Sequence, residues 1–225
     1  MYHKFIKRGL DFSLSLLATI AFSPILLLMI ALGSVVMKGN PFFTQLRPGK
    51  DEKIFKLIKF RSMTCETDQN GELLPDEQRI IGYGKFIRRT SLDELPELIN
   101  ILKGDMSIVG PRPQLVRDML FMTDQQRTRH TVRPGLTGLA QSSGRNGISW
   151  ENKLDLDIKY IESITFWGDV KIILNTVKCV FSQDGITEEG RVTAADLGDY
   201  LLSVGSIDKE TYDKGMEEAK KLLNA

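Results

Sequence analysis

The sequence predicts a mostly helical α/β fold in a monotopic membrane protein, with an N-terminal re-entrant helix-break-helix, interfacial amphipathic helices and a compact cytoplasmic domain. The first observation is FSLSLLATIAFSPILLLMIALGSVVM, residues 12–37, a run of 26 residues without a charge. It exceeds the ~18 apolar residues that mark a membrane helix. The second is Ser23-Pro24, near the midpoint of this run. The third is a composition of 42% hydrophobic and 26% charged residues, typical of a folded domain.

The charges beside the apolar run predict how it meets the membrane. Basic residues flank it on both sides: Lys4, Lys7 and Arg8 before it, and Lys38, Arg47, Lys50, Lys53 and Lys56 after it. Because basic residues mark the cytoplasmic side of a membrane segment, both ends of the run are expected on that side. The chain must then turn within the bilayer.

A bend at Ser23-Pro24 provides that turn. Pro24 removes a backbone hydrogen bond, and the Ser23 hydroxyl can bond back to the carbonyl four residues earlier, so the pair favours a sharp kink. Residues 1–39 are therefore predicted to form a re-entrant anchor. A spanning helix with a tolerated kink and a signal peptide cleaved near Ala31–Gly33 are the alternatives.

The next elements are less certain from their pattern. KIFKLIKF, Lys53–Phe60, fits a short strand or an interfacial helix whose lysines meet anionic lipid. Thr64–Gln78 is polar, with Asn-Gly and Pro, and predicts a loop. RIIGYGKFIRR, Arg79–Arg89, predicts a helix. Residues 154–161 alternate as on a strand edge but fit a helix equally well.

Two adjacent acids stand in TSLDELPELINILKGDMSIVGPRP, residues 90–113. Ser91 followed by Glu94 fits a capping box, with Asp93 beside it in the first helical turn. Pro96 interrupts this helix, so either the helix begins near Pro96 or it is kinked just past the acids.

The acids are also close in sequence to arginines that bind anions. Arg88, Arg89 and Arg112 flank Asp93 and Glu94. A hard oxygen ligand for Mg²⁺, a carboxylate nucleophile and arginine forks for phosphate oxygens are what phosphoryl transfer requires. The segment is therefore a candidate reaction centre as well as a helix start.

Several site classes are disfavoured by what the sequence lacks. It holds two histidines and two cysteines, too few for a zinc cluster or a disulfide framework. Neither a phosphate-binding P-loop nor a G-x-G-x-x-G motif is present. No nucleic-acid partner is expected.

Four segments in order carry a family resemblance: LRPGKDEKIFKLIKFRSM, RRTSLDELPELINILKGDMSIVGPRP, RPGLTGLAQ and LDLDIKYIESITFWGDVKIILNTV. Together they resemble the bacterial sugar transferase family, specifically the small monotopic phosphoglycosyl transferases of the PglC type, over residues 7–181. The resemblance implies transfer of a sugar phosphate from a UDP-sugar, expected to be N-acetylated, to polyprenyl phosphate, which releases UMP. It also implies a membrane hairpin bent at Ser23 and Pro24, at the cytoplasmic face of a bacterial inner membrane, with both termini cytoplasmic.

The resemblance also implies roles for individual residues. Asp93 is expected to be the nucleophile of a ping-pong reaction with a covalent phosphosugar intermediate, and Glu94 to act as a base or metal ligand. Mg²⁺ is expected at Asp93 and Glu94. Phosphate-binding side chains are expected at Arg88, Arg112, Arg145 and Lys59, and Asp157 is expected to join the acidic site.

The resemblance divides the chain into residues 1–39 as anchor, 40–190 as catalytic domain and 191–225 as a C-terminal extension. The extension predicts two short helices around Gly205-Ser206. It is expected either to pack on the catalytic domain or to mediate self-association or binding of a pathway partner. A catalytically inactive scaffold of a glycan pathway and a secreted protein are the alternatives to the enzyme.

Overall fold

Two small sheets organise the chain, an antiparallel hairpin of β1 and β2 and a parallel pair of β3 and β4. The computed structural model describes residues 2–144, 148–182 and 195–224. Its strands are β1 (Phe42–Pro48), β2 (Ile54–Phe60), β3 (Ser107–Val109) and β4 (Gly135–Thr137). Its α-helices are α1 (Lys7–Ala21), α2 (Ser23–Val36), α3 (Asp76–Arg79), α4 (Gly82–Arg89), α5 (Glu97–Lys103), α6 (Val116–Leu120), α7 (Asp124–Arg127), α8 (Leu139–Ser142), α9 (Trp150–Glu162), α10 (Phe166–Ser182), α11 (Leu197–Ser203) and α12 (Lys209–Asn224). Single turns are η1 (Tyr2–Ile6), η2 (Lys50–Glu52), η3 (Leu92–Glu94) and η4 (Thr128–Thr131). The mostly helical α/β class is confirmed.

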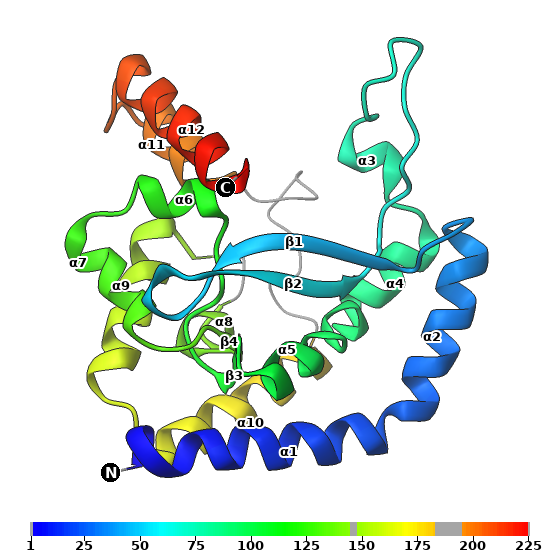
Figure 1. Cartoon of the computed structure of the whole chain (residues 1–225), viewed down its shortest axis with the longest axis vertical. Coiled ribbons are helices and arrows are strands. Elements are labelled where there is room, and N and C mark those ends of the chain that lie inside the picture. Colours follow the sequence, from blue (N-terminus) through cyan, green and yellow to red (C-terminus); the bar gives the residue numbers. More distant parts are fainter. Residues whose placement is uncertain (1, 145–147, 183–194, 225) are drawn as a thin grey trace.

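Helices α1 and α2 form the outer frame of the molecule, α1 below the hairpin and α2 rising beside it (Figure 1). They meet at a 63° bend. The Ser23 hydroxyl donates to the carbonyl of Ile20 at 2.8 Å, three residues back rather than the expected four, and Pro24 opens α2. Among the described residues, no single helix is long and apolar enough to cross a membrane, whereas this bent pair meets the criterion of length and composition together. The predicted break at Ser23-Pro24 is thus confirmed.

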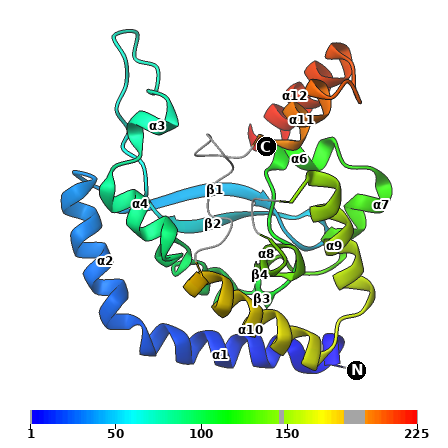
Figure 2. The ribbon, with the colours of Figure 1, turned by 180° about the vertical axis from the view of Figure 1, so that it is seen from behind.

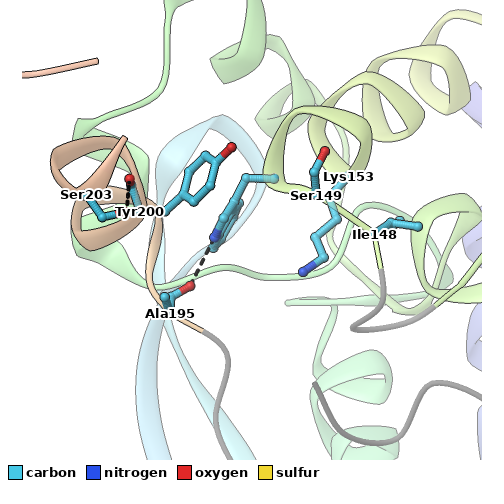
Figure 3. A pocket seen from close by; sticks show the side chains of 7 residues that line it. Ile148, Ser149, Lys153, Ala195, Tyr200 and Ser203 are labelled. Atoms are coloured by element: carbon cyan, nitrogen blue, oxygen red, sulfur yellow. Dashed lines mark hydrogen bonds between the residues drawn. The ribbon is translucent and has the colours of Figure 1, made fainter. Parts of the chain in front are cut away.

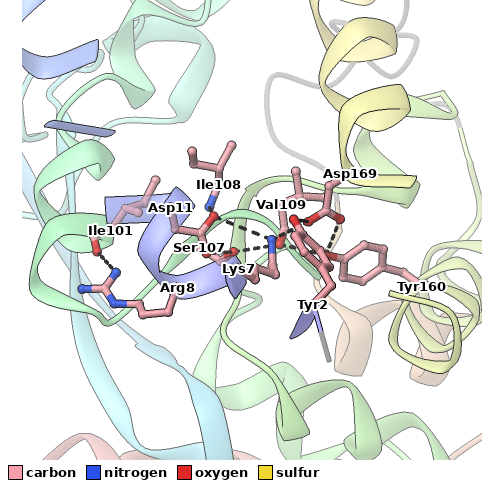
Figure 4. A network of polar contacts seen from close by, with 10 residues as sticks. All are labelled: Tyr2, Lys7, Arg8, Asp11, Ile101, Ser107, Ile108, Val109, Tyr160 and Asp169. Atoms are coloured by element: carbon pink, nitrogen blue, oxygen red, sulfur yellow. Dashed lines mark hydrogen bonds and ion pairs between the residues drawn. The ribbon is translucent and has the colours of Figure 1, made fainter. Parts of the chain in front are cut away.

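The start of α1 is fixed to the rest of the chain by buried charges (Figure 4). The Lys7 ammonium lies 2.7 Å from Asp169 Oδ2 and 3.6 Å from Asp11 Oδ1. Asp169 Oδ1 also accepts from the Tyr160 hydroxyl at 2.9 Å, and Asp11 Oδ2 accepts from the Ser107 hydroxyl at 2.7 Å. These contacts join α1 to β3, α9 and α10, and Figure 2 shows α10 lying beside α1.

The hairpin rests on α5. Strands β1 and β2 pair from Phe42 with Phe60 to Pro48 with Ile54, so KIFKLIKF is a strand and not an interfacial helix. The fully buried Asn100 of α5 completes the ladder, because its amide accepts from Ile58 N–H at 3.1 Å and donates to a β2 carbonyl. Beneath it the core consists of Leu57, Leu98, Ile101 and Met106. The strand that carries Lys59 is therefore held in fixed register over the helix that follows the acidic segment.

The two predicted C-terminal helices are present as α11 and α12, and they pack on α6. Phe121 lies where Gly198 and Gly215 leave room, since a Cβ on either glycine would come within 2.7 Å of its ring. The backbone N–H of Leu197 donates to Asp118 Oδ1 at 2.9 Å. Leu197 also shares a buried cluster with Trp150 of α9. The extension thus contributes to the hydrophobic core of the preceding domain.

A small cavity lies at this junction (Figure 3). Its volume is about 260 Å³, and it lies between the start of α9 and α11. It is lined by Ile148, Ser149, Trp150, Lys153, Ala195, Tyr200 and Ser203. The described residues of the lining include no acidic side chain, so they differ in composition from the acidic segment.

Candidate active site

Asp93 and Glu94 lie on η3, a single 3₁₀ turn between α4 and α5. Ser91 precedes this turn in the left-handed region, at φ 56°, and its side chain caps no backbone N–H. The predicted capping box is therefore wrong, because the helix does not continue through the acids. Pro96 instead directly precedes α5, which agrees with the alternative in which the helix begins near Pro96. The acids thus stand on an irregular turn where side chains can converge.

Glu94 is held by two cations. Its Oε1 lies 2.7 Å from the Lys59 ammonium and accepts from both terminal nitrogens of Arg112 at 3.2 Å. Burial acts to raise the pKa of Glu94, but Lys59 and Arg112 outweigh burial and hold the pKa at about 2. Glu94 is accordingly an ionised carboxylate whose charge is already matched within the protein.

Asp93 differs from its neighbour in having no hydrogen bond or ion pair within the part of the chain that the structure describes. Burial raises the pKa of Asp93 to about 6, and the adjacent Glu94 charge adds to the rise. Lys59, Arg88 and Arg112 oppose the rise without contacting the carboxylate. Asp93 therefore keeps its oxygens free and its charge only partly compensated, as a nucleophile or metal ligand requires.

Glu97 is a third acid at this site, and the sequence reasoning missed it. It is 3% exposed, and its Oε1 lies 3.1 Å from the Lys59 ammonium, so one lysine bridges two glutamates. Burial raises the pKa of Glu97 to about 7, although Lys59 opposes the rise. The sequence feature that could have indicated Glu97 is its position four residues after Asp93, which places an acid at the start of α5.

Arg88 faces the acids from α4. The close approach of Gly84 to Ser62 makes this possible, since a Cβ on Gly84 would lie 1.8 Å from the Ser62 carbonyl oxygen. Arg88 Nε donates to the Ser62 hydroxyl at 2.9 Å. Burial lowers the pKa of Arg88, and the negative charge of Asp93 is the largest effect that opposes this shift. No carboxylate pairs with Arg88 among residues 2–144, 148–182 and 195–224, so its charge is available to an anion.

Arg112 reaches the acids from the segment between β3 and α6. Its side chain is 45% exposed although it pairs with Glu94, so its guanidinium borders both the acid and solvent. Glu94 raises the pKa of Arg112 further. This arginine is therefore paired with an acid on one side and open to an anion from solvent on the other.

The remaining predicted residues are placed differently. Lys59 is occupied by Glu94 and Glu97, whose charges raise its pKa against the opposing effect of burial. Asp157 is buried and pairs with Arg129 at 2.6 Å instead of contacting the acidic turn. Arg145 lies outside the described residues. The phosphate-binding role of Lys59 and Arg145 and the acidic-site role of Asp157 stay predictions.

The far end of α5 is held by the anchor. Arg8 of α1 donates to the carbonyls of Ile101 at 2.6 Å and Leu102 at 3.0 Å. A cation at a helix C-terminus satisfies free carbonyls and complements the helix dipole. The helix that follows the acidic turn is thus fixed to α1 at its opposite end.

The described residues do not by themselves form a metal site. Within the described ranges, no group of three His, Cys, Asp or Glu side chains is arranged to hold a metal ion. Mg²⁺ commonly uses one or two carboxylates together with substrate phosphates and water. The free oxygens of Asp93, with Glu94 next to it, fit such a shared site.

The family model described as bacterial sugar transferase matches residues 2–183, which include the anchor, the acidic turn and both sheets. The chain belongs to the bacterial sugar transferase family. Helices α11 and α12 lie beyond the matched residues.

Similar members of the bacterial sugar transferase family differ in length. The chain is 46% identical over 189 residues to an uncharacterized sugar transferase, EpsL of Bacillus subtilis, and the match covers 84% of this chain and 94% of that protein. It is 40% identical to the UDP-glucose:undecaprenyl-phosphate glucose-1-phosphate transferase of Klebsiella pneumoniae, over 76% of this chain and 39% of that protein. It is 35% identical to the undecaprenyl-phosphate galactose phosphotransferase of Salmonella typhimurium, over 81% of this chain and 42% of that protein. The chain therefore spans less than half of the two larger relatives.

Proposed function

We propose that this chain transfers a sugar 1-phosphate from a UDP-sugar to polyprenyl phosphate, giving a polyprenyl-diphospho-sugar and UMP, as the first step of glycoconjugate assembly. The names of the Klebsiella and Salmonella relatives support the reaction class. The observation that carries the proposal is the contrast between two adjacent acids, since Glu94 is neutralised by Lys59 and Arg112 while Asp93 is unpaired among the residues that the structure describes. An inactive scaffold of a glycan pathway would have no need for an unpaired carboxylate facing Arg88.

The first half-reaction forms a covalent intermediate on Asp93. One Asp93 oxygen attacks the phosphorus that bears the sugar, a new P–O bond forms, and the P–O bond to UMP breaks. UMP leaves with the bridging oxygen and its electron pair. The sugar phosphate remains as a mixed anhydride on Asp93.

The second half-reaction returns the enzyme to its starting state. A phosphate oxygen of the polyprenyl phosphate attacks the same phosphorus, and the bond between phosphorus and Asp93 breaks. Asp93 regains its carboxylate charge, and the product carries the new diphosphate. No proton needs to be gained or lost by Asp93 in the cycle.

The cations around Asp93 support both steps. Arg88 and Arg112 border the carboxylate and lie where they can pair with phosphate oxygens, because neither is fully satisfied by protein acids. Glu94 and Glu97 hold Lys59 beside the same turn. Phosphoryl transfer depends chiefly on such positioning and on compensation of charge.

Mg²⁺ is part of the proposal. When bound, it would neutralise charge between the donor diphosphate and the attacking carboxylate. Asp93, with Glu94 beside it, would hold it together with phosphate oxygens.

The anchor is proposed to lie re-entrant in the cytoplasmic face of a bacterial inner membrane, with both termini cytoplasmic. Large apolar side chains are exposed on α1, α2 and α10: Leu17 62%, Ile20 62%, Leu27 66%, Val35 77% and Trp167 76%. Such a surface is costly in water and favourable in lipid. A polyprenyl phosphate stays near the bilayer, so the acidic turn must operate close to it.

Turnover with both substrates tests the proposed function. Purified chain in detergent, with Mg²⁺ and undecaprenyl phosphate, is given a panel of UDP-sugars that begins with N-acetylated ones, and UMP release is measured. The proposal predicts UMP and a polyprenyl-diphospho-sugar in equal amounts with at least one donor. Absence of both products with every donor, from a chain that is folded by circular dichroism, would overturn it.

A further inference from the structure

The backbone that carries Arg112 cannot be held in the usual way. Arg112 lies between Pro111 and Pro113, and a proline has no N–H to donate to a ladder. The Pro111 carbonyl accepts from the Gly135 backbone N–H at 2.9 Å, but the next two carbonyls are held by arginine side chains from distant elements. The Arg112 carbonyl accepts from Arg129 Nη2 at 2.6 Å, and the Pro113 carbonyl accepts from Arg47 Nη1 at 3.1 Å.

Arg129 is fixed in turn by Asp157. Its Nε and Nη2 donate to the same oxygen, Asp157 Oδ2, at 3.0 and 2.6 Å. Both residues are almost fully buried, at 2% and 1% exposure, and the other oxygen of Asp157 has no hydrogen-bond partner among the residues described. A buried ion pair contributes little net stability, and a half-satisfied one still less. The hydrogen bond from Arg129 to the Arg112 carbonyl gives this ion pair a role other than stabilising the fold.

Arg47 provides the second hold from β1. Its Nη2 donates to Gln45 Oε1 at 2.6 Å, which aims the guanidinium along the strand toward Pro113. In the described part of the chain, Arg47 forms no ion pair with a carboxylate. Burial lowers its pKa to about 10, and Arg112 adds to that shift as a nearby like charge. A buried cation, Arg129, and a half-buried one, Arg47, thus converge on the backbone that carries a third cation, Arg112.

We propose that Arg129, held by Asp157, and Arg47 are positioning residues that set the Arg112 side chain against Glu94 and the phosphates of the donor. This inference rests on the proposed function. It gives Asp157 a role through Arg129 and not through direct contact with the acidic turn.

The test compares Asp157→Asn in two backgrounds, wild type and Arg112→Ala. Asparagine keeps the size of the side chain but removes the charge that fixes Arg129. In wild type we expect kcat/KM for the UDP-sugar to fall about tenfold, mainly through KM. In the Arg112→Ala background we expect a further change below about twofold, because the group being positioned is gone. A purely structural role predicts the same fall in both backgrounds, and that result would overturn the proposal.

Two further variants guard against misfolding and non-specific effects. Arg47→Gln removes the second hold on a half-buried strand residue, and the same non-additivity with Arg112→Ala is expected for it. Arg127→Lys alters a neighbouring arginine that pairs with Glu52 and makes no hydrogen bond or ion pair with residues 110–113 in the described structure. That control is expected to leave kcat/KM within about twofold of wild type.

Equilibrium binding of UDP with Mg²⁺ separates this inference from the proposed function. If wild type binds UDP but shows no turnover, the proposed function is wrong. The UDP binding constants of the same variants then still test the positioning role. Equal loss of UDP affinity from Asp157→Asn with and without Arg112 would overturn the positioning role. Wild type that neither binds UDP nor turns over would overturn both.

Discussion

The acidic turn and the start of α1 both bring lysine and carboxylates together, yet they differ in how completely the charges are matched. At α1, Lys7 lies between Asp11 and Asp169, and Asp169 also accepts from two tyrosine hydroxyls. At the acidic turn, Lys59 is matched by Glu94 and Glu97, but Asp93 has no partner in the described residues. The first arrangement fixes one element against others, whereas the second leaves a carboxylate available for chemistry.

The largest expected effect comes from removing the unmatched charge. Asp93→Asn should lower UMP release by about 10³-fold or more, because an amide cannot act as the nucleophile. Thermal unfolding in detergent at pH 8 should stay at the wild-type midpoint or rise, since an acid with a raised pKa destabilises the fold once it is ionised. Residual turnover near the wild-type rate would contradict the role of Asp93.

Removing a charge that is matched by buried partners should instead lower the stability of the fold. Lys7→Met leaves Asp11 and Asp169 buried without their cation, so stability should fall by about 3–5 kcal/mol. Lys209→Met is the matched control, because its pair with Asp213 is exposed, and it should change stability by no more than about 0.5 kcal/mol. If Lys7→Met and Lys209→Met unfold at the same temperature, burial does not determine how much each ion pair contributes to stability.

His130 tests how a buried titratable side chain without a hydrogen bond in the described structure affects stability as the pH changes. Both ring nitrogens are buried and make no hydrogen bond in the described structure, although Nδ1 lies 3.5 Å from Glu52 Oε1, and burial followed by the Arg129 charge lowers the pKa of His130 to about 4. Glu52 opposes this shift, and Arg127 adds to it. Because the unfolded chain takes up a proton near pH 6.5, stability is complete above that pH and is lost as pH falls toward 4. The loss is on the order of 3 kcal/mol, at about 1.4 kcal/mol per pKa unit.

The measurement is the unfolding midpoint of wild type and His130→Leu between pH 7.5 and 4.5. On acidification from pH 7.5 the variant should gain stability relative to wild type, because Asp93 and Glu97 titrate in both proteins and only the loss at His130 is removed. His3→Gln is the control, since that histidine is exposed, and it should keep the slope. A slope unchanged in His130→Leu would assign the acid sensitivity to other groups.

The smallest effect is expected at Glu97. Glutamine retains an oxygen for the Lys59 ammonium, and Lys59 keeps its shorter contact with Glu94. Glu97→Gln should therefore leave donor KM and kcat within about threefold of wild type, measured by UMP release. A loss as large as that of Asp93→Asn would make Glu97 a member of the reacting group.

Local patterns were enough to predict the break at Ser23-Pro24 and the two C-terminal helices, and they gave the start of α5 near Pro96 as one of two alternatives. Each depends on proline, glycine or apolar spacing within a few residues. Ser91 and Glu94 have the spacing of a capping box, but no capping box forms, because Pro96 places the start of the helix beyond them. Local rules therefore predict where elements begin more securely than what a side chain contacts.

Long-range contacts explain what the sequence could not predict. Lys59 meets Glu94 across 35 residues, and only the strand register over α5 brings them together. Arg129 meets Asp157 across 28 residues on η4 and α9, and neither residue has a local signal for this pair. The mixture of acids and arginines identified the site, but the partner of each charge depended on the fold.

Intact-protein mass spectrometry tests the central claim most directly. The chain is incubated with Mg²⁺ and each UDP-sugar without polyprenyl phosphate, beside Asp93→Asn. The account predicts an added mass equal to one sugar phosphate on wild type, absent from Asp93→Asn and lost when polyprenyl phosphate is added. Product formation with no adduct on wild type under any donor would contradict it and indicate direct transfer between the two substrates.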